Sequence, residues 1–281
     1  MLRVALPNKG QLAEPAREML HEAGYLRASG PRELVVQDPD NDVEFFFLRP
    51  RDIATYVGAG TLQVGITGRD MLLDSGAAAE EVLALGFGGS TFRLAVPAGS
   101  ASAVADLSGR RIAASYAGLL DAYLERHGVT AEVVRLDGAV ENAVRLGVAD
   151  AVADVVATGT TLRQAGLEVV GDPILVSEAI VVRPAGAATD PAVDTFVRRL
   201  QGVMVARSYV MVDYDIRAEL VERACAITPG IESPTVSPLH EEGWVAVRAM
   251  VPQRDVHRVM DDLYELGGRG ILVTAIAACR L

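Results

Sequence analysis

The sequence predicts an α/β protein in which a two-lobed region precedes a smaller C-terminal domain. Short apolar runs alternate with helical stretches over residues 1–97, and the same alternation returns between residues 111 and 182. From residue 209 onward the order of elements changes to βαββαβ. We therefore expect a first lobe at 1–90 plus 183–207, a second lobe at 91–182 and a separate domain at 208–281.

In the first lobe, three apolar runs are each followed by a turn and a helical stretch. Strands that are connected through helices need right-handed crossovers, so these runs should pair in parallel. The expected strands are 3–6, 44–48 and 62–67, and the expected helices are one that ends near Ala23, one at 52–57 and one that opens at Gly68.

The second lobe repeats this pattern between two crossings of the chain. Extended runs between residues 83 and 96 lead into it, and the apolar run 174–182 leads back to the first lobe. Two lobes joined in this way leave a cleft between them, which is a common place for a ligand. The expected strands are 111–115, 132–136, 151–156 and 167–170, the expected helices are 139–146 and one from Thr160, and a helix at 191–206 follows the return.

Residues 209–281 follow the split βαβ pattern of ferredoxin-like folds. Such a domain often serves as a regulatory module, although a fold alone does not assign a function. The expected elements are strand 209–216, helix 218–226, strands 233–239 and 244–251, helix 255–266 and strand 271–279.

The composition excludes several kinds of partner. A net charge of −11 repels nucleic acid and anionic membranes, so we expect neither as a partner. Cys225 and Cys279 are far apart and form no CxxC motif, which argues against a disulfide framework or a zinc site. No apolar run approaches the roughly 20 residues that span a bilayer, and the first residues lack a signal-peptide pattern. We therefore expect a cytoplasmic protein.

The strongest local signal is a threonine- and glycine-rich turn that follows the strand ending near Asp154. Residues Thr158, Gly159, Thr160 and Thr161 occupy this turn at the start of a helix. The first backbone N–H groups of a helix lack intrahelical partners and lie at the positive end of its dipole, so they can bind a phosphate together with the hydroxyl groups. An ordinary threonine-capped helix would show the same residues.

Acidic residues accompany this turn at the same predicted edge of the sheet. Asp137 and Glu141 stand at another strand-to-helix junction, and Asp154 closes its strand. Carboxylates beside a phosphate site suit ribose hydroxyls or Mg²⁺. Asp137 and Glu141 could instead be acids at a helix start that favour the helix dipole.

Basic residues follow all three predicted strands of the first lobe. In open α/β sheets ligands bind outside the carboxyl ends of the strands, so these side chains should face the cleft and neutralise a triphosphate or pyrophosphate. A single arginine in such a loop is more often a solvated surface charge. The residues are Lys9 and Gly10 after the first strand, Arg49 and Arg51 after the second, and Arg69 and Asp70 after the third.

Other residue types add little to a catalytic hypothesis. Tyr116, just past strand 111–115, could stack on a base, although a lone aromatic is more often simply packed. The four histidines have no adjacent serine or cysteine nucleophile pattern, so histidine catalysis finds no support.

Six short segments spread along the chain form a more specific pattern. They are LPNKG at 6–10, FLRPRDI at 47–53, GITGRD at 65–70, LDGAVE at 136–141, DVVATGTTL at 154–162 and ITPGIESPT at 227–235. In this order they resemble the long form of the ATP phosphoribosyltransferase family. That resemblance implies a two-lobed, periplasmic-binding-protein-like catalytic region.

The family's reaction is the first step of histidine biosynthesis. Adenine N1 of ATP attacks C1 of phosphoribosyl pyrophosphate (PRPP), which gives N1-(5-phosphoribosyl)-ATP and Mg²⁺-bound pyrophosphate. N1 has no proton to lose at neutral pH, so positioning and charge stabilisation suffice. By this resemblance Thr158 to Thr161 hold the 5-phosphate, Glu141 and Asp154 face the ribose and Mg²⁺, Lys9, Arg49 and Arg69 neutralise phosphates, and Tyr116 lies beside the adenine.

The C-terminal domain is similar to an ACT module, and the resemblance implies that it binds histidine as a feedback inhibitor. It also implies dimers and hexamers, without a separate regulatory subunit. The residues that match the effector pocket are Asp215, Ile231, Thr235, Ala249 and Met250.

Two other functions are compatible with the same architecture. A prephenate dehydratase also joins a two-lobed catalytic region to an ACT domain, but its catalytic Thr-Arg-Phe run is absent, and the nearest segment is Thr91-Phe92-Arg93. A non-catalytic two-lobed ligand sensor is the third possibility.

Overall fold

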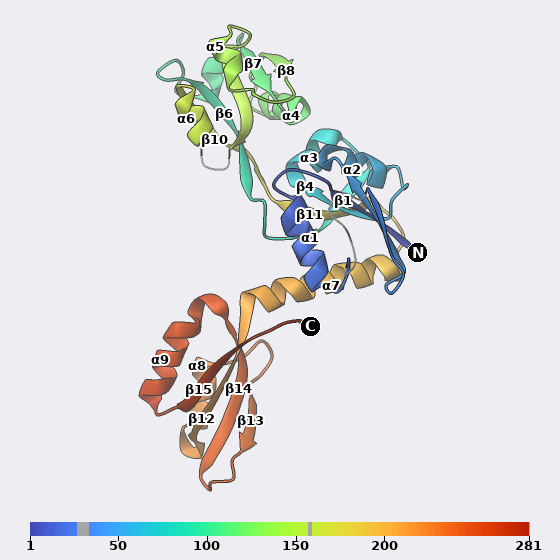
Figure 1. Ribbon diagram of the computed structural model, residues 1–281. Coiled ribbons are helices and arrows are strands. Elements are labelled where there is room, and N and C mark those ends of the chain that lie inside the picture. Colours follow the sequence, from blue (N-terminus) through green and yellow to red (C-terminus); the bar gives the residue numbers. More distant parts are fainter. Residues whose placement is uncertain (27–33, 157–158, 281) are drawn as a thin grey trace. The chain divides into compact units, whose positions relative to one another are not determined.

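The computed structural model describes residues 1–26, 34–156 and 159–280 (Figure 1). Residues 1–18 and 25–197 form one compact unit, and residues 19–24 and 198–281 form a second. The first unit contains a six-stranded and a five-stranded sheet, and the second contains a four-stranded sheet. No described helix is both long and apolar enough to cross a membrane.

The six-stranded sheet has its parallel strands at the centre. β1 pairs in parallel with both β3 and β4, as predicted for strands that are separated by helices. The outer pairs β2/β3, β11/β4 and β11/β5 are antiparallel. The strand order is β2 (Val35–Asp38), β3 (Val43–Leu48), β1 (Leu2–Pro7), β4 (Val64–Gly68), β11 (Ala179–Pro184) and β5 (Ala79–Ala84), and the helices are α1 (Ala13–Glu22), α2 (Pro50–Gly58) and α3 (Arg69–Ser75).

The sequence explains why these elements form. β4 is buried along its whole length, which is typical of a central strand covered on both faces. α2 begins with Pro50, whose fixed φ suits the first turn, and it buries Ile53, Ala54 and Val57. These three side chains form a core cluster with Ala5 of β1 and residues of β11.

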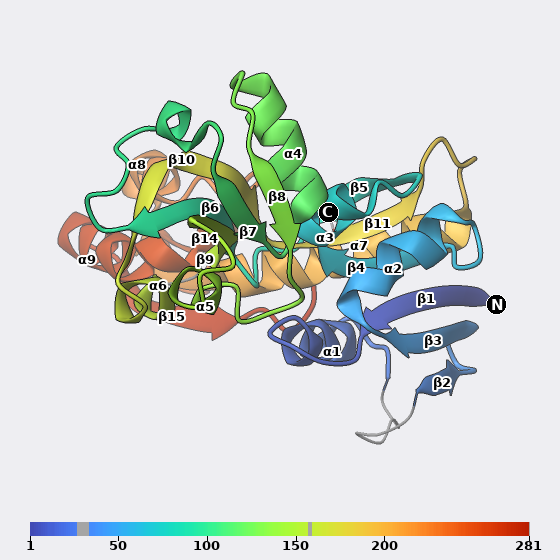
Figure 2. The same ribbon diagram turned by 90° about the horizontal axis from the view of Figure 1, so that it is seen from above.

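The five-stranded sheet belongs to the second predicted lobe. β7 pairs in parallel with β8 and β9, whereas β6 pairs antiparallel with β9 and β10, and β6 and β10 lie side by side in Figure 2. The strand order is β10 (Leu167–Ser177), β6 (Ser90–Pro97), β9 (Ala151–Val156), β7 (Arg111–Ala114) and β8 (Glu132–Arg135), and the helices are η1 (Val104–Leu107), α4 (Ala117–Arg126), α5 (Asn142–Arg145) and α6 (Thr160–Gln164).

One prediction for this lobe differs from the structure. The helix expected at 139–146 is only α5, because Gly138 and Ala139 have φ values of 119° and 50°, which are incompatible with a right-handed helix. The apolar run 174–182 leads back to the first lobe, as predicted, and it contains parts of two strands. β10 ends at Ser177, and β11 begins at Ala179 in the other sheet, so the return crossing is confined to the residues around Glu178.

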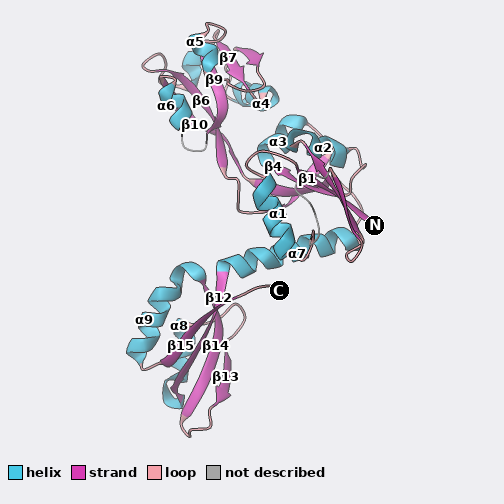
Figure 3. Cartoon of the chain, viewed as in Figure 1, coloured by secondary structure: helices cyan, strands magenta, loops and turns pink. Residues whose placement is uncertain are grey.

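The second unit has the predicted βαββαβ order, with its four strands arranged as β13-β14-β12-β15. The two main helices pack on one face of the sheet, where they share a core cluster with β12 and β14 (Figure 3). The last strand ends at Ala275 and not at 279 as expected. The helix α7 (Pro191–Ser208) begins in the first unit and ends in the second. The elements that follow it are β12 (Tyr209–Arg217), η2 (Ala218–Leu220), α8 (Val221–Ile227), β13 (Thr235–Pro238), β14 (Trp244–Pro252), η3 (Gln253–Asp255), α9 (Val256–Leu266) and β15 (Arg269–Ala275).

Close packing of α2 on β4 makes Gly65→Ala a test of the first sheet. An added Cβ would lie 2.7 Å from Ile53 Cγ2 and 3.0 Å from Ala5 Cβ. We expect the substitution to lower the free energy of unfolding by about 1–3 kcal/mol, as overpacking of a core does. Urea unfolding measures the change.

Gly89→Ala is the matched control, because nothing lies within 4 Å of a Cβ at that position. It should change the free energy of unfolding by less than about 0.5 kcal/mol. Equal losses in the two variants would contradict the packing explanation.

Candidate functional site

Residues from three strand ends meet at one edge of the first sheet. Because β1, β3 and β4 run parallel, the segments that follow them emerge at the same edge. Lys9 and Arg49 are exposed there, and Gly10 has a φ of 79°, which suits a glycine in a turn. Neither Lys9 nor Arg49 forms an ion pair with another residue that the structure describes. Both side chains are therefore available to an anion.

Arg51 joins this edge to the second lobe. Its Nη2 donates to the carbonyl oxygen of Ser115 at 3.2 Å, and its Nη1 lies 3.6 Å from Oδ1 of Asp137. The guanidinium carbon is 5.1 Å from the ring centre of Tyr116. Nη1 is buried without a hydrogen-bond partner among the described residues. The sequence pointed to a basic strand end here, but it did not single out Arg51 as the bridge.

Tyr116 lies between the two lobes as a buried residue, only 5% exposed. Its ring packs edge-on against Phe92 at 5.4 Å, so one part of its surface is already occupied. Burial raises the pKa of the Tyr116 hydroxyl, and the nearby Asp70 carboxylate raises it further. The phenol therefore stays protonated and can donate to Asp70. Full stacking on a base, as the sequence suggested, would compete with these contacts.

Asp70 is fixed at the start of α3. It is 5% exposed, its backbone N–H donates to Ser177 Oγ at 3.1 Å, and its Oδ1 accepts from the backbone N–H of Met71 at 2.9 Å. Asp70 is thus held by the return crossing on one side and faces Tyr116 on the other.

The predicted acidic pair is brought together in the second lobe. Asp154, two residues before the end of β9, accepts a 3.0 Å hydrogen bond from Ser115 Oγ. Burial raises the pKa of the Asp154 carboxyl, and the charge of Glu141 adds to this rise, although the Val155 N–H and the Ser115 hydroxyl oppose it. A cation bound between Asp154 and Glu141 would relieve this cost. No group of three or more metal-ligating side chains occurs among the described residues, so a metal here would need ligands from a substrate.

The predicted phosphate-binding turn, of which Gly159–Thr161 are described, lies beside Glu141. Gly159 precedes α6 with a φ of 72°, and a Cβ there would lie 3.3 Å from Arg163 Nη1, so the position favours glycine. Thr160 and Thr161 open α6 and are exposed. Glu141 and Thr161 line the same surface pocket. Thr158, the first threonine of the predicted site, lies outside the described residues.

Arg69 has a different environment from Lys9 and Arg49. Its Nε and Nη2 donate to the two carboxylate oxygens of Glu81 at 2.8 and 2.7 Å, and Nη2 also donates to Glu178 at 3.2 Å. The hydrogen bond to Glu81 raises the pKa of Arg69 and lowers the pKa of Glu81. Two carboxylates therefore compensate a charge that the sequence suggested for substrate phosphates.

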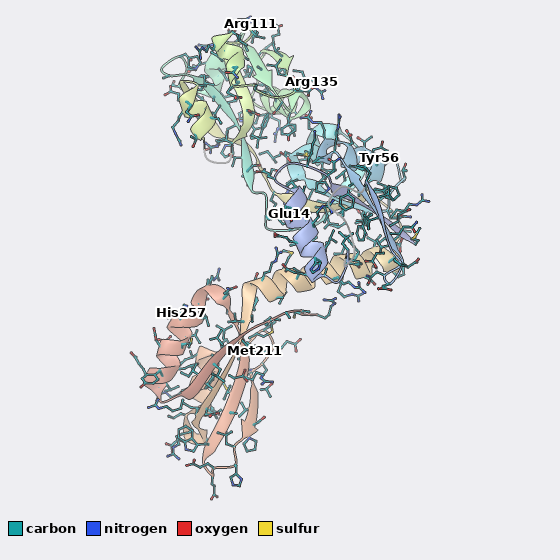
Figure 4. All side chains as sticks on the ribbon, viewed as in Figure 1. Glu14, Tyr56, Arg111, Arg135, Met211 and His257 are labelled. Atoms are coloured by element: carbon teal, nitrogen blue, oxygen red, sulfur yellow. The ribbon has the colours of Figure 1, made fainter. Side chains whose placement is uncertain are left out.

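The predicted effector residues do not share one face of the C-terminal sheet. Asp215 and Met250 occupy the face away from the helices, together with Met211 of β12 (Figure 4) and Thr235. Ala249 is paired with the buried Val212 and lies on the helix-covered face, 3% exposed. Ala249 could therefore border a ligand on the open face only through its backbone, because neighbouring residues of a strand point to opposite faces.

The other positions near this face agree with a small-molecule site. Ile231 is 38% exposed in the loop before β13. Gly270 has a φ of 59°, and a Cβ there would lie 3.4 Å from Asp215 Oδ2, so glycine leaves room beside that carboxylate. Among the histidines, His257 is exposed on α9 of the second unit (Figure 4).

Comparisons with known proteins identify the relatives of this chain. Residues 49–202 match the family model described as ATP phosphoribosyltransferase, and residues 206–278 match the one described as HisG, C-terminal domain. The ATP phosphoribosyltransferase of Pseudarthrobacter chlorophenolicus is 63% identical over 284 residues, and that of Streptomyces coelicolor is 62% identical over 285 residues. Each alignment covers 100% of both chains.

A solved structure gives the corresponding fold. A chain of the ATP phosphoribosyl transferase (HisG:HisZ) complex from Thermotoga maritima matches with a TM-score of 0.64 and 28% sequence identity. The match covers 73% of this chain and 98% of that chain.

The buried carboxyl of Asp154 leads to a prediction about stability. Because burial raises its pKa above the ordinary value of 3.8, the folded state binds the proton more tightly than the unfolded chain. This contribution to stability is complete below pH 3.8 and is lost as the pH rises through the raised pKa. Asp154→Asn should therefore increase the free energy of unfolding at pH 7, and the gain should shrink as the pH falls toward 3.8.

Urea unfolding at several pH values measures this difference. Asp121→Asn, on the exposed face of α4 in the same lobe, is the control and should stay within about 0.5 kcal/mol of the parent protein. A loss of stability at pH 7 in Asp154→Asn would contradict the burial argument.

Proposed function

The chain belongs to the ATP phosphoribosyltransferase family, and we propose that it joins ATP to PRPP through the residues at the two facing sheet edges. The bond from adenine N1 to C1 of the ribose forms, and the bond from C1 to the pyrophosphate oxygen breaks. The products are N1-(5-phosphoribosyl)-ATP and pyrophosphate, and the reaction is the first step of histidine biosynthesis. The family match favours this function over a dehydratase-like enzyme or a non-catalytic sensor.

The observation that supports the site is the contact of Arg51 with Ser115 and Asp137. It places the basic edge of the first sheet next to the strand ends of the second, where Asp154 and the phosphate turn lie. A chain with a net charge of −11 needs such a local collection of cations to attract two anionic substrates. Each lobe can then hold one substrate against the other.

The chemistry asks for positioning and charge stabilisation, and the described residues offer both. Adenine N1 is a nucleophile without prior loss of a proton, so no general base is required. Lys9 and Arg49 can neutralise phosphate charge that builds up on the leaving pyrophosphate. The Gly159–Thr161 turn can hold the 5-phosphate, and Asp154 with Glu141 can face the ribose, where positive charge develops at C1.

We assign Mg²⁺ to the leaving pyrophosphate, with Glu141 and Asp154 as the protein groups nearest to it. The metal would stabilise the negative charge of the departing oxygen. Two carboxylates fit a Mg²⁺ ion that takes its remaining ligands from substrate phosphates and water. The raised pKa of Asp154 supports a nearby cation, because a cation favours the ionised carboxylate that burial penalises.

The C-terminal domain is the proposed site of histidine feedback. The carboxylate of Asp215 can pair with the amino group or the imidazolium of histidine, and Thr235 and Met250 lie on the same face of the sheet. The solved relative is a complex of two different proteins. This chain has its own match to the C-terminal domain, so we propose a homo-oligomer, from dimer to hexamer, without a separate regulatory subunit.

The direct test of function is incubation of the purified protein with ATP, PRPP and Mg²⁺. The absorbance near the adenine band should rise, and mass spectrometry should show the N1 adduct. Removal of Mg²⁺ with EDTA should abolish the product. A protein that forms no adduct without added subunits would disprove the assignment.

Lys9→Met tests the basic edge of the first sheet. We expect kcat/KM to fall at least about 100-fold, because a charge aimed at the leaving group is lost. Initial rates at varied PRPP concentrations measure the effect, and Lys9→Arg should restore part of it. Arg3→Met is the control, since Arg3 is exposed at the opposite end of the same strand and should leave the rate within about twofold.

Calorimetry with histidine tests the regulatory proposal. Histidine should bind the parent protein, and Asp215→Asn should weaken its affinity by at least about tenfold, since a charge-assisted hydrogen bond is removed. Asp261→Asn, exposed on α9, should leave the affinity unchanged. Binding of leucine as strong as that of histidine would refute a specific effector site.

A further inference from the structure

Arg69 is bound to the return crossing at several points. Its backbone N–H donates to the carbonyl oxygen of Glu178 at 3.1 Å, and its Nη1 donates to the carbonyl oxygen of Val176 at 3.4 Å. Nη2 donates to the Glu178 carboxylate at 3.2 Å and to Glu81 of β5 at 2.7 Å. The next residue, Asp70, donates its backbone N–H to Ser177. The start of α3 therefore holds the whole segment 176–178.

Glu178 also contacts the other segment that connects the two lobes, the residues around Gly86 between β5 and β6. Its Oε2 accepts from the backbone N–H of Gly86 at 3.0 Å, while its Oε1 accepts from Arg69. The two crossings also bond directly, because the N–H of Ala179 donates to Phe87 and the N–H of Leu85 donates to Ala179. Arg69 thus contacts the return crossing directly and the segment around Gly86 through the Glu178 carboxylate.

These contacts argue against a phosphate ligand at this position. The Arg69 side chain is 22% exposed, and both Glu81 and Glu178 are within hydrogen-bond distance of its guanidinium. A substrate phosphate would meet two carboxylates there and would have to displace them. Lys9 and Arg49 have no such competitor among the described side chains.

We propose that Arg69 is a positioning residue that fixes both interlobe crossings on the first lobe, and that it does not bind substrate phosphates. The position of the crossings determines where the second lobe contacts Asp70 and Arg51. It therefore also determines how a nucleotide at one sheet edge is oriented toward a sugar phosphate at the other. This inference rests on the proposed transfer reaction. A misplacement of about 1 Å between reacting groups can cost about 100-fold in rate, so a small change at the crossings is enough to matter.

The two carboxylate partners distinguish positioning from phosphate binding. If Arg69 positions the lobes, Arg69→Gln should lower kcat between about 10-fold and 100-fold, and Glu178→Gln and Glu81→Gln should each lower it by a similar factor. The dissociation constant for PRPP, measured by calorimetry, should change by less than about twofold. If Arg69 binds a substrate phosphate, removal of a competing carboxylate should leave kcat unchanged or tighten substrate binding, which would overturn the proposal.

The double variant Arg69→Gln/Glu178→Gln provides a second measurement. Residues of one network are not additive, so kcat of the double variant should equal that of the more impaired single variant. Additive losses would show that the two residues act separately and would overturn the proposal. Arg69→Lys should restore only part of kcat, because an ammonium group cannot make the same paired contacts.

Glu80→Gln is the matched control. Glu80 is the neighbour of Glu81 on β5 and forms a 2.7 Å ion pair with Arg183 of β11, but that pair reaches neither crossing. Its kcat should stay within about twofold of the parent protein, because an exposed ion pair contributes little to stability. An equal loss in Glu80→Gln would assign the effect to general sheet stability and would overturn the proposal.

The experiment separates this inference from the proposed function. Adduct formation by the parent protein tests the function, and unchanged activity in Glu81→Gln and Glu178→Gln would refute only the positioning role. Thermal unfolding is recorded for every variant. If Arg69→Gln does not fold, the two glutamate variants, which replace carboxylates by amides of the same shape, decide the outcome.

Discussion

The direction of the strands is the constraint on which this molecule depends. β1, β3 and β4 run parallel in one sheet, and β7, β8 and β9 run parallel in the other. Parallel pairing requires that each chain segment after a strand leaves at the same edge. Residues from distant parts of the sequence are thereby collected at two edges without any long loop. Lys9, Arg49, Asp137 and the Gly159–Thr161 turn all follow such strand ends.

Basic residues at the strand ends differ in how far neighbouring carboxylates compensate their charge. The chain as a whole is acidic, so anion binding depends on the few cations whose charge is not compensated by neighbours. Lys9 and Arg49 meet this condition among the described side chains, whereas Arg69 is paired with Glu81 and Glu178. Asp154 has a different imbalance, because burial raises its pKa and so makes its carboxyl costly to ionise. Such costs are common at functional sites, where a ligand compensates them.

The crossings connect fold and chemistry. In the proposed reaction the two lobes hold different substrates, so the lobes must keep a fixed relation, and that relation depends on two short segments near Gly86 and Glu178. Hydrogen bonds join these segments to each other and to the start of α3. Asp70, one residue farther along, faces Tyr116 of the second lobe. Arg69 and Asp70, which directly follow β4, therefore contact both the return crossing and Tyr116.

The sequence alone determined the architecture and the strand ends at which the candidate site residues lie. Hydrophobic periodicity identified the central strands, and the strand-end rule brought Lys9, Arg49 and Asp154 to sheet edges, because both depend on local order along the chain. It did not show the local turn at Gly138 and Ala139, which shortens a predicted helix. It also did not show contacts between distant segments, such as the sheet register that puts Met250 and Met211 on one face. Only the tertiary structure showed that Arg69 is compensated and that Arg51 bridges the lobes, since a side chain's charge balance depends on residues that folding brings within about 4 Å.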